Sequence, residues 1–131
     1  MTHEQLSVLE FHKKFGLTVN GTPTSPSFAD RELRIKLMVE KLQEYIDATS
    51  IVQVADALAN LQYVLLGTAV SWGIDLDSIF REVHRSNMTK VWPDGTVKKN
   101  EFGKVIKPPS YSPAQIKEII LRQAAKGSPH A

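Results

Sequence analysis

The sequence predicts an all-α fold: an antiparallel bundle of four to five helices with a small C-terminal hairpin or loop. Apolar residues recur at helical spacing through most of the first two thirds of the chain. Short stretches of turn residues separate these segments, and short connections favour antiparallel neighbours. The 131 residues, 42% hydrophobic and 23% charged, suffice for a hydrophobic core. We therefore expect a single domain over residues 1–131.

The first expected helix covers residues 3–15, with Gly16 as its C-terminal stop. Residues 17–27 contain prolines, a glycine and several hydroxyl side chains, which is typical of a loop. Ser27 can then cap the next helix, because its hydroxyl can accept a hydrogen bond from the first helical turn. That second helix is expected over residues 28–48.

Two further helices are expected before the character of the chain changes. Ser50 can cap a third helix over residues 51–72, which Gly73 ends. A fourth helix is expected over residues 76–90, where apolar residues again recur at helical spacing. The connections between these helices are only a few residues long, which supports the bundle.

The C-terminal part is less regular. Residues 92–109 carry a Pro-Asp-Gly turn, a second turn and short apolar pairs, which predicts a small β-hairpin or an ordered irregular loop. Ser112 as a cap and Pro113 at the first helical position favour a final helix over residues 113–125. We expect residues 126–131 to form a frayed tail.

Composition excludes several kinds of chemistry. The chain has no cysteine, so disulfides, thiolate metal sites and cysteine nucleophiles are ruled out. The net charge is only +2 and no basic run is concentrated, so we expect no nucleic-acid partner. The N-terminal residues lack a signal core, and polar side chains interrupt the longest apolar stretch, residues 54–70. We therefore expect a cytoplasmic protein with no membrane partner.

Acidic side chains gather on two consecutive helices. Glu40, Glu44 and Asp47 stand at i, i+4 and i+7, so they share one face of the second helix. Asp56 and Asn60 form an i, i+4 pair on the third helix, where nearly every neighbouring position is apolar. If the two helices pack as a hairpin, these sets can face each other. Oxygen-only ligands suit Mg²⁺ or Mn²⁺, so the pattern predicts a divalent metal site.

Two ordinary structural roles compete with a metal site. The carboxylates of the second helix can form a solvated face paired with Lys36, Lys41 or Arg34, because most helix charges lie on the surface. Asp56 can instead form a buried salt bridge with a lysine or arginine, since ionised carboxylates are rarely buried without a cationic partner.

The end of the fourth helix carries the polar run HRSNMTK, residues 84–90. His84, Asn87 and Lys90 recur every three residues and so share a side, where they can contact phosphates and a sugar or base. The alternative is a solvated helix face. Four lysines lie among the turns that follow: Lys98, Lys99, Lys104 and Lys107. They can clamp a polyphosphate, or merely keep an exposed hairpin soluble.

The order of these motifs resembles the MazG-like all-α nucleoside triphosphate pyrophosphohydrolases, and is most similar to the small single-domain members related to phosphoribosyl-ATP pyrophosphohydrolase. The resemblance runs from EFHKKFG (10–16) to KPPSYSPAQI (107–116). Its most specific parts are VADALANLQYVLLGTAVSWGIDLDSIFREVHRSNMTKVWPDGTV and GKVIKPPSYSP. It implies hydrolysis of the α–β phosphoanhydride of a nucleoside triphosphate with Mg²⁺, or possible Mn²⁺, in a homodimer or homotetramer.

The sequence departs from the family pattern at two positions. In the pattern E-E-x-x-E, Glu40 matches the first glutamate and Glu44 the last, whereas Lys41 replaces the middle one. On the next helix the family pattern is E-x-x-D or D-x-x-x-D. Ala57 gives no glutamate for the first form, whereas in the second form Asp56 matches the first aspartate and Asn60 stands at the closing one. Together the two replacements shift the charge of the site by about three units, which weakens divalent binding.

The resemblance assigns roles to the remaining residues. The implied metal ligands are Glu40, Glu44, Asp56 and Asn60. One of the two glutamates is expected to orient or deprotonate the attacking water; we choose Glu40, although no feature of the sequence distinguishes it from Glu44. The implied substrate contacts are His84, Asn87, Lys90, Asp94, Lys104 and Lys107.

Three hypotheses for function follow. The first is a Mg²⁺-dependent nucleoside triphosphate pyrophosphohydrolase, for example a house-cleaning enzyme acting on deoxy or non-standard nucleotides. The second is a nucleotide-binding member of the same fold whose catalysis is impaired by Lys41 and Asn60. The third, outside the resemblance, is a plain helical dimerisation module with salt-bridged acidic groups.

Overall fold

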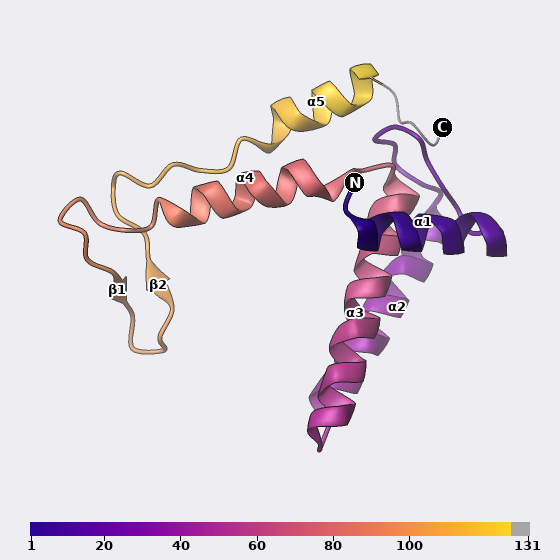
Figure 1. Ribbon diagram of the computed structural model, residues 1–131, viewed down its shortest axis with the longest axis horizontal. Coiled ribbons are helices and arrows are strands. Elements are labelled where there is room, and N and C mark those ends of the chain that lie inside the picture. The colour runs from indigo at the N-terminus through magenta and orange to yellow at the C-terminus, as the bar shows by residue number, and fades with distance from the viewer. Residues whose placement is uncertain (127–131) are drawn as a thin grey trace. The chain divides into compact units, whose positions relative to one another are not determined.

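The computed structural model describes residues 1–126, and this part of the chain contains five helices and one two-stranded sheet (Figure 1). The elements are α1 His3–Phe15, α2 Phe28–Asp47, α3 Ile51–Trp72, α4 Leu76–Met88, β1 Lys98–Lys99, β2 Val105–Ile106 and α5 Ile116–Lys126. The predicted all-α class is therefore confirmed. The expected tail lies outside the described residues except for Lys126, which ends α5.

The chain divides into two compact units. Among the described residues, the first comprises Met1–Leu76 together with residues 122–126, and the second comprises Asp77–Leu121. The expected single domain over the whole chain stays a prediction.

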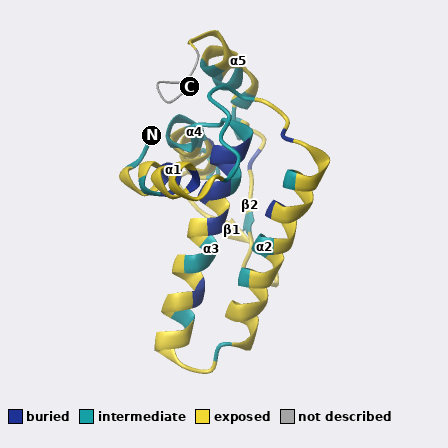
Figure 2. Cartoon of the chain, turned by 90° about the vertical axis from the view of Figure 1, so that its right-hand side faces the viewer, coloured by how far each residue is buried: buried dark blue, intermediate teal, exposed yellow. Residues whose placement is uncertain are grey.

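The first unit is built on an antiparallel hairpin of α2 and α3, with α1 packed across α3 (Figure 2). Its helix ends are those predicted from local chemistry. Ser27 Oγ accepts a hydrogen bond from Asp30 N, and Ser50 Oγ accepts one from Gln53 N, each at 3.1 Å. Gly73 ends α3 in the left-handed conformation, with φ 70°, which glycine adopts without steric cost.

The core of the first unit lies where α1 crosses the C-terminal half of α3. Val8 and Leu9 from α1 pack there against Leu66 and Val70 from α3, and all four side chains are buried. The opposite end of the α2–α3 hairpin is largely exposed in Figure 2. The apolar surface of the hairpin therefore extends well beyond the core.

The expectation that Asp56 lies among buried apolar side chains is wrong for this chain. Asp56 is exposed, and so are the apolar side chains of Val52 (79%) and Leu58 (48%), although the adjacent Ala57 is buried (2%). The physical reason is that the core formed with α1 lies at the other end of α3 (Figure 2), around Leu66 and Val70. The apolar pattern predicted the helix correctly but did not show which of its faces is covered.

Arg34 and His12 are buried beside Gly67. Arg34 retains only 5% of its exposed surface, and its Nη2 donates a hydrogen bond to the backbone oxygen of Val64 at 2.8 Å. A Cβ atom on Gly67 would overlap Arg34 Nη2 and lie 2.8 Å from His12 Nε2. The absence of a side chain at Gly67 therefore makes room for the guanidinium of Arg34 and the imidazole of His12 between α1, α2 and α3.

The hydrogen bond of His12 determines which of its ring nitrogens carries a proton. Nδ1 lies 3.0 Å from the backbone oxygen of Thr18, which can only accept, so Nδ1 is the donor. In the neutral ring, Nε2 then faces the guanidinium side without a proton. Burial lowers the pKa of His12, and the charge of Arg34 lowers it further, against the opposing effect of the Thr18 hydrogen bond.

In the second unit, the segment before α5 is hydrogen-bonded to α4. Ser86 Oγ donates to the backbone oxygen of Ser112 at 2.7 Å, and the backbone N–H of Ser112 donates to Thr89 Oγ1 at 2.8 Å. The prediction that Ser112 caps a helix starting at residue 113 is wrong, because these bonds hold the segment outside a helix. α5 begins instead at Ile116.

Two other details of the second unit can be compared with the sequence. α4 ends at Met88 rather than at residue 90, and Thr89 Oγ1 donates to the backbone oxygen of Ser86 at 2.7 Å. The expected hairpin is present as antiparallel β1 and β2, in which Lys98 pairs with Ile106. The sequence thus predicted the position of the hairpin correctly but predicted α4 to be about one half turn too long.

No single described helix is long and apolar enough to cross a membrane, although α3 and α4 pass the length and composition test together as a bent pair.

We predict that Gly67→Ala destabilises the protein. An alanine normally favours a helix, but here its Cβ would overlap Arg34, so we expect the free energy of unfolding to fall by about 1–3 kcal/mol. Chemical denaturation measures this. In the double variant with Arg34→Ala, the two losses should be less than additive because they share one contact. Additive losses, or a stabilised Gly67→Ala variant, would contradict the packing described here.

We predict a loss of stability in mild acid that depends on His12. Its pKa is lowered in the folded state from the ordinary 6.5, so the unfolded chain takes up the proton first. The stabilisation is therefore complete above pH 6.5 and is lost as the pH falls below that value. Thermal unfolding from about pH 8 down to about pH 5, a range that includes the ordinary pKa of histidine, measures this loss of stability.

His12→Gln should flatten this pH dependence, since glutamine keeps a donor but does not titrate in this range. His84→Gln is the matched control, because His84 is exposed on α4. An equal pH dependence in the wild type and in His12→Gln would contradict the prediction.

Candidate functional site

Lys41 lies between the two glutamates of the predicted acidic face on α2. Its Nζ is 3.2 Å from Glu44 Oε1, to which it donates a hydrogen bond, and 3.6 Å from Glu40 Oε1. The side chain of Lys41 is 23% exposed, less than that of Glu40 (57%) or Glu44 (42%). The hydrogen bond to Glu44 and the charges of both carboxylates raise the pKa of Lys41. The lysine is therefore charged and already neutralises part of this face.

Asp47, the third carboxylate on this face, makes a different contact. Its Oδ1 accepts a hydrogen bond from Gln43 Nε2 at 2.9 Å, one turn earlier on the same helix. Both residues are exposed. Asp47 thus has the contacts of a solvated helix face, which was one of the two alternatives for this set.

Asp56 and Asn60 are bonded to each other on α3. Asn60 Nδ2 donates to the backbone oxygen of Asp56 at 2.8 Å and to Asp56 Oδ1 at 3.2 Å. The nitrogen of the amide, which cannot ligate a cation, is therefore the atom turned towards the carboxylate. The buried salt bridge considered for Asp56 is not formed, because Asp56 is exposed and its carboxylate accepts from Asn60.

The acidic residues of the first unit do not fit a resident Mg²⁺ in this arrangement. Within residues 1–126, no three His, Cys, Asp or Glu side chains are grouped so that they could hold a metal ion. The glutamates already share an ammonium ion, and a dication would be repelled by it. The predicted ligand set of Glu40, Glu44, Asp56 and Asn60 therefore stays a prediction.

The polar run of the second unit is split between a helix and a turn. His84 and Asn87 are exposed on α4, whereas Lys90 follows the end of the helix. The backbone N–H of Lys90 donates to the oxygen of Asn87 at 3.1 Å, which closes a tight turn. The helix therefore ends two residues before Lys90, which lies in the turn that follows. The predicted roles of His84, Asn87 and Lys90 in substrate binding are a separate matter and stay predictions.

Asp94 shapes the turn before the hairpin. Its Oδ1 accepts hydrogen bonds from Thr96 Oγ1 at 2.6 Å and from the backbone N–H of Thr96 at 3.0 Å. These bonds, the hydroxyl first, lower the pKa of Asp94. Asp94 is therefore an ionised turn residue whose contacts are local.

The lysines of the hairpin region differ in how they are held. Lys98 Nζ lies 4.1 Å from the centre of the Trp92 ring, and Lys107 Nζ lies 4.9 Å from the centre of the Tyr111 ring. The backbone N–H of Lys104 donates to Asn100 Oδ1 at 3.0 Å. Stacking on an aromatic ring restrains a lysine without neutralising it, so Lys98 and Lys107 remain available to an anion.

Sequence reasoning missed the residues that organise the second unit. Glu82 pairs with Arg85 at 2.7 Å and accepts the backbone N–H of Gln115, also at 2.7 Å. The bond from Arg85, followed by that from Gln115, lowers the pKa of Glu82 to about 2. The i, i+3 spacing of Glu82 and Arg85 was a readable signal. The contact between Glu82 and Gln115 had no such sequence signal, because it joins segments far apart in the sequence.

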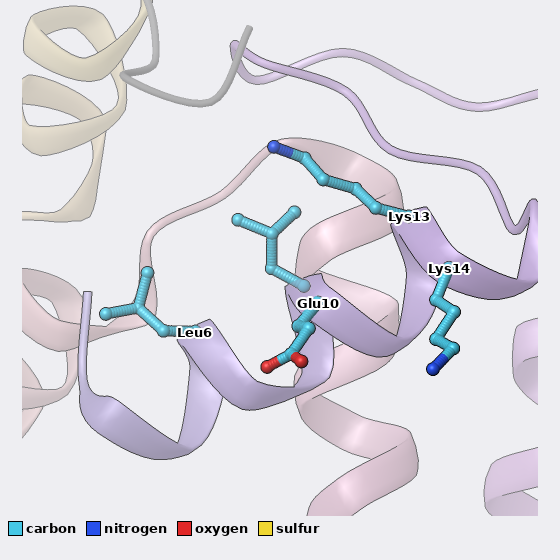
Figure 3. A pocket seen from close by; sticks show the side chains of 5 residues that line it. Leu6, Glu10, Lys13 and Lys14 are labelled. Atoms are coloured by element: carbon cyan, nitrogen blue, oxygen red, sulfur yellow. The ribbon is translucent and has the colours of Figure 1, made fainter.

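One pocket lies beside α1, away from the predicted site residues of α2 (Figure 3). All of its lining residues belong to that single helix: Leu6, Leu9, Glu10, Lys13 and Lys14. A depression formed by one helix face does not enclose a ligand, so we assign it no function.

The chain matches a known family over its helical part. The family model described as phosphoribosyl-ATP pyrophosphohydrolase matches residues 8–87, which include α2, α3 and most of α4. No curated protein matches the chain. The family match supports a hydrolase activity of the pyrophosphohydrolase kind. Because it covers more than half of the 131 residues, the chain belongs to the phosphoribosyl-ATP pyrophosphohydrolase family.

Proposed function

We propose that the protein hydrolyses nucleoside triphosphates at the α–β phosphoanhydride, releasing a nucleoside monophosphate and pyrophosphate. The family match over residues 8–87 carries this proposal, because it includes both helices of the acidic hairpin. In the reaction the oxygen of a water molecule bonds to one of the two phosphorus atoms. The bridging P–O bond then breaks, and a proton is released. Removing that proton requires a base near the water.

Glu40 is the carboxylate best placed for that base. Glu44 accepts the hydrogen bond of Lys41, whereas the Glu40 contact with the same ammonium is longer, 3.6 Å against 3.2 Å. Glu40 is also the more exposed of the two, at 57%. A carboxylate that is less committed to a neighbour is freer to accept a proton from water. These contacts support the assignment of Glu40 made from the sequence.

We assign the substrate phosphates and sugar to the polar side chains of the second unit. His84 and Asn87 are exposed, so a ligand can reach their donors. Lys107 is held against Tyr111 but keeps its charge. The proposed contact residues are His84, Asn87, Lys90, Asp94, Lys104 and Lys107. Asp94 differs from the others because its carboxylate is engaged by Thr96, so its contribution would be to shape the turn.

Mg²⁺, or Mn²⁺, remains the proposed cofactor on the resemblance alone. The residues as they are placed do not fit a resident ion, because Lys41 occupies the space between the glutamates. We therefore derive no step of the reaction through a metal. This observation also favours a second candidate function, a nucleotide-binding member of the family with impaired catalysis.

We also propose that the protein is a homodimer that associates through the exposed sides of α2 and α3. Ile35, Leu42, Ile51, Leu58 and Leu65 are between 44% and 87% exposed. Within each helix they repeat every seven residues, which is the spacing of a helix–helix seam. Apolar surface of this extent on a single chain favours association with another copy. A homotetramer is the other assembly that the family resemblance implies.

We predict that incubation with a panel of nucleoside triphosphates and Mg²⁺ or Mn²⁺ releases pyrophosphate. Glu40→Gln should lower the rate at least about 100-fold, because general base catalysis contributes of this order. Glu32→Gln is the matched control, since Glu32 is exposed on the same helix. Nucleotide binding without pyrophosphate release would support the second candidate. Absence of both would overturn the proposal and leave a helical dimerisation module.

We predict that Leu58→Glu weakens self-association. A carboxylate at this apolar position should raise the dissociation constant of the dimer about 10-fold or more, which corresponds to about 1.4 kcal/mol. Light scattering over a concentration series measures the mass. Gln53→Glu adds the same charge at an exposed polar position on another side of α3 and should leave the mass unchanged. A wild-type protein that is monomeric at all concentrations would refute the dimer.

A further inference from the structure

We infer that Lys41 is the built-in counter-ion of the acidic face, so that the free protein holds no divalent cation there and any such cation arrives with the nucleotide. The second half of this inference, that the cation arrives with the nucleotide, rests on the proposed function. The first half, that the free protein holds no divalent cation at the acidic face, concerns the protein alone and can be tested without any nucleotide.

The position of the Lys41 ammonium carries the argument. It lies 3.2 Å from Glu44 and 3.6 Å from Glu40, so it is within ion-pair distance of both carboxylates. A Mg²⁺ ion needs its oxygen ligands at about 2.0–2.1 Å in a nearly octahedral arrangement. The ammonium and a dication shared by the same two oxygens would therefore occupy overlapping space and repel each other. One must leave before the other can bind.

The low exposure of Lys41 indicates that the lysine is restrained. Its side chain is 23% exposed, although lysine usually extends its charged end into water. Lys36, one turn earlier on α2, is exposed and forms no ion pair within the described residues. The contact is therefore a property of position 41 and not of every lysine on this helix.

The carboxylates near Lys41 are few. Glu40 and Glu44 supply two negative charges, of which the ammonium compensates one. On α3, Asn60 brings no charge, and its amide nitrogen donates to the carboxylate of Asp56. Within residues 1–126 no three acidic or imidazole side chains are grouped to hold a metal ion, so Asp56 does not complete a ligand set with the glutamates.

A nucleoside triphosphate would change this balance. Its phosphate oxygens supply several ligands to Mg²⁺, so the protein needs to add only one or two carboxylates. Lys41 could then turn from the glutamates towards a phosphate oxygen, for which an ammonium is a suitable partner. The lysine would exchange one anionic partner for another, and the metal would enter already bound to its ligands.

The test measures binding of Mn²⁺ alone to the free full-length protein, by the loss of the free-ion signal in electron paramagnetic resonance. We expect no binding by the wild type at millimolar Mn²⁺. Lys41→Glu with Asn60→Asp should bind at least about 10-fold more tightly. Lys36→Glu with Asn60→Asp makes the same overall charge change and should bind less tightly than the Lys41 pair. Circular dichroism confirms that each variant is folded, and Lys41→Met replaces Lys41→Glu if it is not.

Two outcomes would overturn the first half of the inference. One is wild-type binding of Mn²⁺ as tight as that of the Lys41→Glu, Asn60→Asp variant. The other is an equal gain from the Lys36 and Lys41 pairs, which would show a general charge effect. The second half is tested by repeating the titration with a nucleotide whose α–β bridge is a methylene group. Mn²⁺ retained by the wild type only with this nucleotide supports it, and no retention refutes it.

These results are separate from the proposed hydrolysis. Failure to release pyrophosphate in the nucleotide panel would remove the proposed reaction while leaving the Mn²⁺ titration of the free protein intact. Conversely, tight Mn²⁺ binding by the wild type would remove this inference and strengthen the Mg²⁺-dependent reaction.

Discussion

The contact between Arg34, His12 and Gly67 is the interaction on which the first unit depends. A charged side chain is rarely buried without compensation, and here backbone and hydroxyl oxygens of α3 supply it. The same guanidinium brings α2 against α3, and His12 joins α1 to the same point, because its Nε2 lies beside Gly67 of α3. The acidic residues lie further along this hairpin. Their mutual positions therefore follow from how firmly the two helices are joined at Gly67.

Local chemistry could be predicted from the sequence, whereas contacts between distant segments could not. Ser27 and Ser50 cap their helices as expected, because a cap needs only the first turn that follows it. Ser112 has the same local signature, yet its groups bond to α4 and no helix begins there. Arg34 was expected on the surface by its charge. Its burial requires the space at Gly67, which no spacing rule connects with it.

The candidate site shows the same division. The spacing of Glu40 and Glu44 predicted that they share a face, and Lys41 joins them there. The expected burial of Asp56 failed because an apolar pattern does not tell which partner covers it. The family match ends at residue 87, so Lys90, Asp94, Lys104 and Lys107 lie beyond it. Their roles rest on the wider sequence resemblance and on exposure, and the acidic hairpin is the better supported part of the site.

The pairing of Lys41 with its neighbours has a genetic consequence. Both of its ion pairs lie within one turn of α2, so they form without any rearrangement of the fold. Lysine and glutamate codons differ by one purine at the first base, and so do asparagine and aspartate codons. The fully acidic motif is therefore two single-nucleotide transitions away from this gene. Natural variation can move the chain between the two forms in either direction while α2, α3 and their core stay as they are.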